Sequence, residues 1–149
     1  MLTEILTQLY ERDLAKLKAE IEAYSNEADL WTKPGDVPNS AGNLCLHLNG
    51  YLQHFFGAVL GGTGFVRDRD AEFSSTGIAR ETMLADVDKT LHVVTATLAN
   101  LTDDDYAKNY PLEVFGGPIT TGFFATHLAV HLDWHLGQIN YHRRLIPKD

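Results

Sequence analysis

Apolar side chains recur every three or four residues along much of the chain, which is the spacing of one buried helix face. The first such stretch predicts a helix from about Leu2 to Tyr24, and two prolines and a glycine then mark residues 31–38 as a loop. Asn39 or Ser40 suits the N-cap of a second helix, which the glycine-rich residues 61–64 end. The first part of the chain therefore predicts two amphipathic helices.

A third helix is predicted in the middle of the chain. Ser74, Ser75 or Thr76 can cap its N-terminus. Its apolar positions have the spacing of a bundle seam and are Leu84, Val87, Leu91, Val94 and Leu98.

The fourth predicted helix begins near Thr120 or Thr121 and ends before Pro147. Gly116 and Gly117 before it could turn a short hairpin, although Pro118 opposes regular strand pairing. Four amphipathic helices in one small chain favour an all-α fold, a four-helix bundle with a short irregular or hairpin-like segment before the last helix.

Length and composition fit this fold. The chain has 149 residues, of which 44% are hydrophobic and 21% charged, so we expect residues 1–149 to form a single domain. It contains no uninterrupted apolar run long enough to span a bilayer, and its first residues lack the basic segment of a secretory signal. We therefore expect a cytoplasmic protein without a membrane partner.

The charge balance narrows the partners further. The formal net charge is −8, from 12 basic and 20 acidic residues, which argues against a nucleic-acid partner because such binding rests on clustered Lys and Arg. Cys45 is the single cysteine, so no intramolecular disulfide forms and a reducing compartment fits.

The strongest chemical signal is three histidines at four-residue spacing, His127, His131 and His135, in the fourth helix. Residues four apart lie about 6 Å apart along one helix face, so two such imidazoles can reach one divalent ion. The outer pair lies about 12 Å apart along the axis, which prevents all three from binding the same ion. At least one further ligand must come from elsewhere in the chain.

The second helix offers two candidates, His47 and His54, seven residues apart and on nearly the same face, with Tyr51 between them. They differ by about 10 Å in height, so a single ion would bind one of them. Cys45 is a chemically suitable zinc ligand, but it points about 200° away from His47 and is expected to be a small buried side chain.

At these residues the chain resembles the DinB/YfiT-like bundles. Residues 39–48, Asn-Ser-Ala-Gly-Asn-Leu-Cys-Leu-His-Leu, and residues 131–139, His-Leu-Asp-Trp-His-Leu-Gly-Gln-Ile, carry the resemblance, which covers nearly the whole chain. That family includes damage-inducible proteins and metal-dependent thiol transferases.

The resemblance implies a divalent metal bound by His47, His131 and His135. His127 and His54 would then be neighbours of the ion or part of a substrate pocket, and His127, His54 and Tyr51 are the candidates for a catalytic role. Gln138, which matches the family motif, would hydrogen-bond near the site. Leu136 departs from a frequent form of the family, in which Arg follows the last histidine, so this position implies no recognition of substrate charge.

Three histidines on zinc or nickel, the metals we expect, leave open coordination positions. The leading hypothesis is an enzyme that transfers or modifies a small low-molecular-weight thiol, with the metal activating the thiolate. Hydrolysis by metal-bound hydroxide is the alternative, although neither histidine face carries a Glu or Asp as general base.

A third hypothesis is a non-catalytic, metal-binding or stress-related dimeric bundle, and we expect a homodimer. Five phenylalanines could line a substrate pocket or a dimer interface: Phe55, Phe56, Phe65, Phe73 and Phe115.

Overall fold

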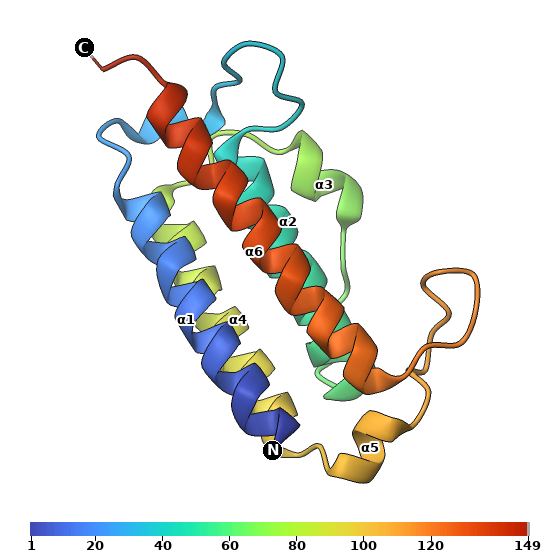
Figure 1. Ribbon diagram of the computed structural model, residues 1–149. Helices are drawn as coiled ribbons and strands as arrows, with labels where there is room; N and C mark the ends of the chain where they lie inside the picture. The colour runs from blue at the N-terminus through green and yellow to red at the C-terminus, as the bar shows by residue number, and fades with distance from the viewer. Residues whose placement is uncertain (149) are drawn as a thin grey trace.

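The computed structural model, which describes residues 1–148, is an all-α helical bundle (Figure 1), as the sequence predicts. Its long helices are α1 (Leu2–Glu22), α2 (Ala41–Leu52), α4 (Arg80–Ala99) and α6 (Thr121–Leu145). A π-helical segment, η2 (Gln53–Leu60), continues α2. The shorter elements are η1 (Glu27–Trp31), α3 (Arg69–Ser74) and α5 (Asp103–Ala107).

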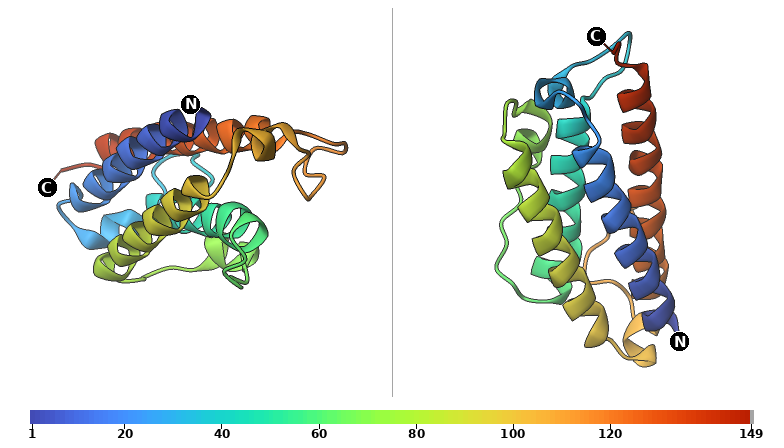
Figure 2. Two further views of the ribbon diagram at one scale, coloured as in Figure 1. Left: turned by 90° about the horizontal axis from the view of Figure 1, so that it is seen from below. Right: turned by 90° about the vertical axis from the view of Figure 1, so that its left-hand side faces the viewer.

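The four long helices form a closed ring of neighbours. Helix α1 packs against α4 and α6, and α2 packs against the same two helices, as the views in Figure 2 show. Figure 1 shows that α2 and α4 run in the same direction. The chain must therefore return along the bundle between them, and residues 61–79, which we call the crossover segment, make this return and contain α3.

The helix ends agree with the predicted caps except in α4. Ser40 accepts a hydrogen bond from the backbone N–H of Asn43 and caps α2, and Thr120 caps α6 in the same way. The prediction of a serine or threonine cap for the third long helix is wrong, because α4 begins after Ala79, which has no capping side chain. Residues 74 and 75 instead end α3, and the Ser75 carbonyl accepts a hydrogen bond from the side chain of Asn43 at 2.8 Å.

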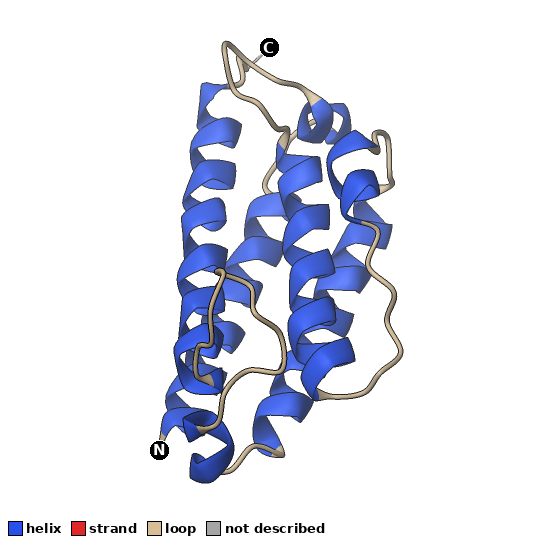
Figure 3. Ribbon diagram, turned by 90° about the vertical axis from the view of Figure 1, so that its right-hand side faces the viewer, coloured by secondary structure: helices blue, strands red, loops and turns tan. Residues whose placement is uncertain are grey.

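The segment before α6 is hairpin-like, as predicted, but very short. One isolated antiparallel bridge joins Asn109 and Thr120, and the N–H of Tyr110 donates to the carbonyl of Ile119 at 2.8 Å. Among residues 1–148 no strand forms, and Figure 3 shows the segment as a loop lying over the bundle. Helix α5 just before it was not predicted, because five residues are too few to show a periodicity.

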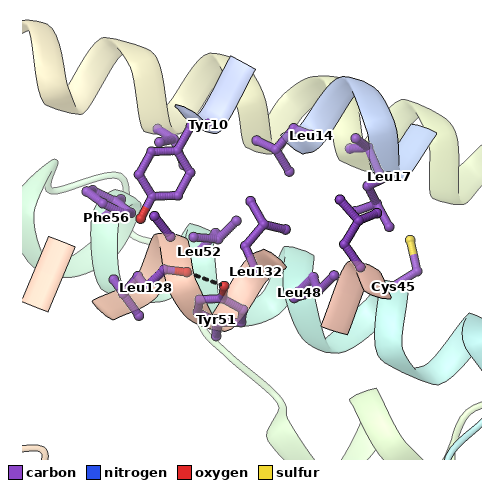
Figure 4. Packing of buried hydrophobic residues seen from close by; sticks show 14 of the residues in the cluster. Tyr10, Leu14, Leu17, Cys45, Leu48, Tyr51, Leu52, Phe56, Leu128 and Leu132 are labelled. Atoms are coloured by element: carbon purple, nitrogen blue, oxygen red, sulfur yellow. Dashed lines mark hydrogen bonds between the residues drawn. The ribbon is translucent and has the colours of Figure 1, made fainter. Parts of the chain in front are cut away.

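Buried tyrosines fix α6 against its neighbours. The core is built from large apolar side chains of all four long helices (Figure 4). Within it, the hydroxyl of Tyr10 on α1 donates to the carbonyl of Ala125 at 2.7 Å, and that of Tyr51 on α2 donates to the carbonyl of Leu128 at 2.9 Å. These bonds set the position of α6, and with it the direction of its histidines. None of the helices within residues 1–148 has the length and apolar character that crossing a membrane requires.

Candidate metal centre

Two of the three α6 histidines converge as their spacing predicts. The Nε2 atoms of His131 and His135 lie 2.8 Å apart. Two imidazole nitrogens that bind one ion at about 2.0–2.1 Å lie roughly 3 Å from each other, so this pair needs little movement to share an ion.

The third histidine comes from α2. The ring centroid of His47 lies 5.3 Å from that of His131 and 5.2 Å from that of His135, with the rings nearly perpendicular. One nitrogen of each ring forms a group whose members all lie within 4.8 Å of one another. This donor set fits a divalent transition metal, because imidazole suits zinc, nickel, copper and iron. His127 is not part of the group.

Hydrogen bonds to the outer ring nitrogens favour the tautomer that a metal site needs. The Nδ1 atom of His135 lies 2.7 Å from the amide oxygen of Gln138, and that of His47 lies 2.9 Å from a carboxylate oxygen of Glu72. Both oxygens can only accept, so each Nδ1 carries the proton and each Nε2 keeps a free lone pair. The hydrogen bond predicted for Gln138 near the site is therefore present, with His135 as its partner.

Glu72 is the residue that the sequence did not reveal. It lies on α3 in the crossover segment, where its side chain is only 6% exposed, and Arg67 donates to both of its oxygens at 2.8 Å. Gly50 makes room for it, because a Cβ at this position of α2 would overlap the Glu72 carboxylate. No periodicity marks Glu72, but a metal-bound histidine usually donates to a carboxylate or carbonyl, so the crossover alongside α2 was the place to look for one.

Electrostatics keep Glu72 ionised despite its burial. Burial raises the pKa of its carboxyl, but hydrogen bonds from Arg67 and His47 lower it further, and the net shift is downward. The Nη2 atom of Arg67 also lies 3.3 Å from Nδ1 of His47. Arginine only donates, and so does this Nδ1, so the shared acceptor Glu72 is what holds the two side chains together.

The α6 pair is neutral at physiological pH. Burial, with smaller contributions from the neighbouring His135 and His47, lowers the pKa of His131 to about 4. Burial likewise lowers the pKa of His135. Neutral imidazole is the form that binds metals, so these two residues need not lose a proton to solvent before ligation.

A cavity of about 290 Å³ opens beside the histidine group. It lies between α2, η2, α6, the crossover segment and the loop before α6. Two of the three histidines contribute to its wall, which is otherwise mostly aromatic and basic. The lining residues are His47, Tyr51, Phe55, Arg67, Arg69, Val114, Phe115, Phe124, His127, Leu128 and His131.

The three catalytic candidates lie in different surroundings. His127 lines the cavity, with its ring 4.9 Å from that of Phe115. Tyr51 also forms part of the wall, but its hydroxyl is buried and donates to Leu128, and burial raises its pKa well above the usual value. His54 is not among the lining residues. It lies half-buried in η2, with its ring centroid 4.8 Å from that of Phe55.

Two other polar residues are accounted for by packing. Cys45 is fully buried, as predicted, and burial raises the pKa of its thiol to about 12. The sequence pattern places His142 on the same face as His131, but it lies about 16 Å further along the helix axis. There its Nδ1 accepts from the hydroxyl of Tyr24 at 2.7 Å and its Nε2 donates to the carbonyl of Thr32 at 2.8 Å, so it holds the loop after α1.

A profile of the DinB superfamily matches residues 9–139. The chain belongs to the DinB superfamily. The match contains all three histidines of the candidate centre, together with Glu72 and the crossover segment that carries it. No curated protein matches this DinB-superfamily chain.

Proposed function

We propose that the chain binds one zinc or nickel ion through His47, His131 and His135 and uses it as an enzyme acting on a small thiol. The observation that carries the proposal is the convergence of three imidazole nitrogens within 4.8 Å beside a cavity. A site closed by four protein ligands would be structural, whereas three histidines leave positions for an exogenous ligand. Superfamily membership supports a metal-binding protein.

The ion would supply Lewis acidity, which lowers the pKa of a thiol bound at an open position. The protein residues do the rest. Glu72 and Gln138 orient two of the ligating rings, and the aromatic side chains of the cavity exclude water from the sulfur. The thiol is an external molecule, because the Cys45 sulfur is buried away from the cavity.

The proposed reaction is a substitution at carbon. The thiolate sulfur forms an S–C bond with an electrophilic substrate, and the leaving group departs with the electron pair of the bond that breaks. The imidazole of His127, which lines the same cavity, accepts the thiol proton.

For the alternative reaction, hydrolysis, the cavity offers only a histidine, His127, as general base. Metal-dependent hydrolysis requires a general base that activates water, commonly a Glu or Asp. Among the described residues that line the cavity there is no carboxylate, and Glu72 is engaged by Arg67 and His47.

The test is turnover by zinc- and nickel-loaded protein with a panel of thiols, such as cysteine, glutathione and coenzyme A, and a reactive alkyl or aryl halide. We expect at least one thiol to be consumed with formation of its thioether. His135→Ala should abolish the reaction, and His92→Ala, an exposed histidine on α4, should leave it unchanged. Metal-loaded protein that consumes no thiol across the panel would contradict the proposal.

We also propose a homodimer, which an exposed stripe on α6 supports. Large apolar side chains on its outer face are 59–71% exposed and follow one another at intervals of seven, four and seven residues: Phe123, Val130, Trp134 and Tyr141. That spacing is typical of a helix seam that another helix covers. Sedimentation equilibrium should give twice the chain mass, and Trp134→Glu should give the monomer mass.

A further inference from the structure

The wall of the cavity next to His47 is basic. Arg67 is held rigidly there, because Glu72 binds its Nε and Nη2 atoms and its guanidinium lies 5.8 Å from the centre of the Phe55 ring. Its side chain is 14% exposed and lines the cavity. Within residues 1–148 its Nη1 group has no hydrogen-bond partner, so these donors remain available to a molecule in the cavity.

A second arginine contributes to the lining of the cavity. Arg69 lines the cavity, and its guanidinium lies 5.3 Å from the centre of the Phe73 ring. In the described part of the chain the exposed side chain of Arg69 makes no hydrogen bond or salt bridge. Its charge is therefore uncommitted, unlike that of Arg67, which Glu72 partly neutralises.

The remaining lining of the cavity is mostly aromatic. The rings of Phe55 and Phe124 lie 5.0 Å apart at 84°, and Phe115 lies 6.0 Å from Phe124. A ligand with a flat apolar body can pack against these rings. An uncharged substrate would leave the guanidiniums of Arg67 and Arg69 without an acceptor, whereas a carboxylate accepts from an arginine through two parallel bonds.

We propose that the electrophilic substrate is a small, flat apolar molecule that carries a carboxylate, which Arg67 and Arg69 bind while the aromatic wall holds its body. That the bound molecule is an electrophile rests on the proposed function, and the inference deepens that function by naming the substrate class. The cavity volume of about 290 Å³ limits the ligand to roughly ten to fifteen non-hydrogen atoms.

The test measures binding, not turnover, and uses the full chain freed of metal by a chelator. Removing the metal matters because a carboxylate could otherwise bind the ion directly. The probes are phenylacetate and its uncharged amide, phenylacetamide, followed by shifts of the backbone amide signals in NMR spectra. A ligand of this size binds at about millimolar concentration, which the method detects.

We expect phenylacetate to bind about tenfold more tightly than phenylacetamide, with shifts at Phe115 and Phe124. Arg69→Gln should weaken phenylacetate about fivefold and leave phenylacetamide unchanged. Arg144→Gln removes an equal charge from an exposed position at the end of α6 outside the cavity, and it should change neither. Arg69 has no structural partner within residues 1–148, so its variant should fold normally.

Equal binding of the two probes, or loss of phenylacetate binding in both arginine variants, would overturn the proposal. A third result would also overturn it: 3-mercaptopropionate binds more tightly than its amide, but phenylacetate does not bind more tightly than phenylacetamide. The arginines would then bind a carboxylate of the thiol substrate and not of the electrophile. The outcome is independent of the proposed reaction. If phenylacetate binding depends on Arg69 but the protein transfers no thiol, the carboxylate site stands and the transferase function is rejected. If the protein transfers a thiol but phenylacetate binding does not depend on Arg69, only the carboxylate site is rejected.

Discussion

Glu72→Gln tests whether the carboxylate on the crossover segment supports a metal site. The substitution keeps the size of the side chain and one oxygen that can accept from Nδ1 of His47. It removes the negative charge and turns an amide NH₂ toward Arg67, which donates to both carboxylate oxygens. The histidine is therefore still able to adopt the required tautomer, but it is a weaker ligand because the carboxylate no longer raises its basicity.

The magnitude follows from what is lost. Removing the outer hydrogen-bond partner of a metal-bound histidine typically weakens metal binding by 10–100-fold, and since Gln retains an acceptor we expect about tenfold, or ~1.4 kcal/mol. The loss of the Arg67 ion pair also destabilises the fold. Arg67 borders the cavity and stays 14% exposed, so we expect about 2 kcal/mol, less than for a fully buried pair. The variant should therefore remain folded.

The assay is competition for zinc against a chromophoric chelator at pH 7, with the free energy of unfolding measured by urea. Glu81→Gln on α4 is the control, because it removes an exposed carboxylate without affecting the histidine group. Zinc affinity within twofold of the wild type in Glu72→Gln would refute the reasoning, since Glu72 would then be only a partner of Arg67.

Three further predictions concern the surroundings of the site and the core of the bundle. Gly50→Ala should displace Glu72 and weaken zinc binding about tenfold in the same chelator assay, although alanine favours helix by about 1 kcal/mol. Gly137→Ala, where an added Cβ meets nothing within 4 Å, should not weaken it. Tyr51→Phe should lower the free energy of unfolding by about 1–2 kcal/mol, because a buried α6 carbonyl loses its donor, and unchanged zinc content would confirm that the hydroxyl has no role in ligation. Burial raises the pKa of the Cys45 thiol to about 12. At pH 8 a disulfide reagent should therefore react with Cys45 on the order of a thousandfold more slowly in native than in unfolded protein. Comparable rates would contradict the burial of Cys45.

The sequence predicts the long helices well because each buries an amphipathic face and three of them end at recognisable signals. For α6 the cap at Thr120 and the proline at position 147 bracket the observed helix, Thr121–Leu145. The same spacing argument places His131 and His135 correctly, because contacts four residues apart depend only on local helix geometry.

The sequence does not predict contacts between residues that are far apart in the chain. Glu72 lies 25 residues from His47, on a six-residue helix that has no periodic pattern of its own. Apolar spacing also does not predict the change from α- to π-helical turns at Gln53.

The metal content of the native protein tests the central claim most directly. Elemental analysis of the purified chain, before and after incubation with zinc or nickel, should find about one ion per chain in the wild type and in His127→Ala. His131→Ala and His135→Ala should each retain almost none while keeping the helical circular dichroism of the wild type. A wild-type chain that takes up no metal after incubation, or His131→Ala and His135→Ala variants that bind as much metal as the wild type, would contradict the assignment of His47, His131 and His135 as the ligands.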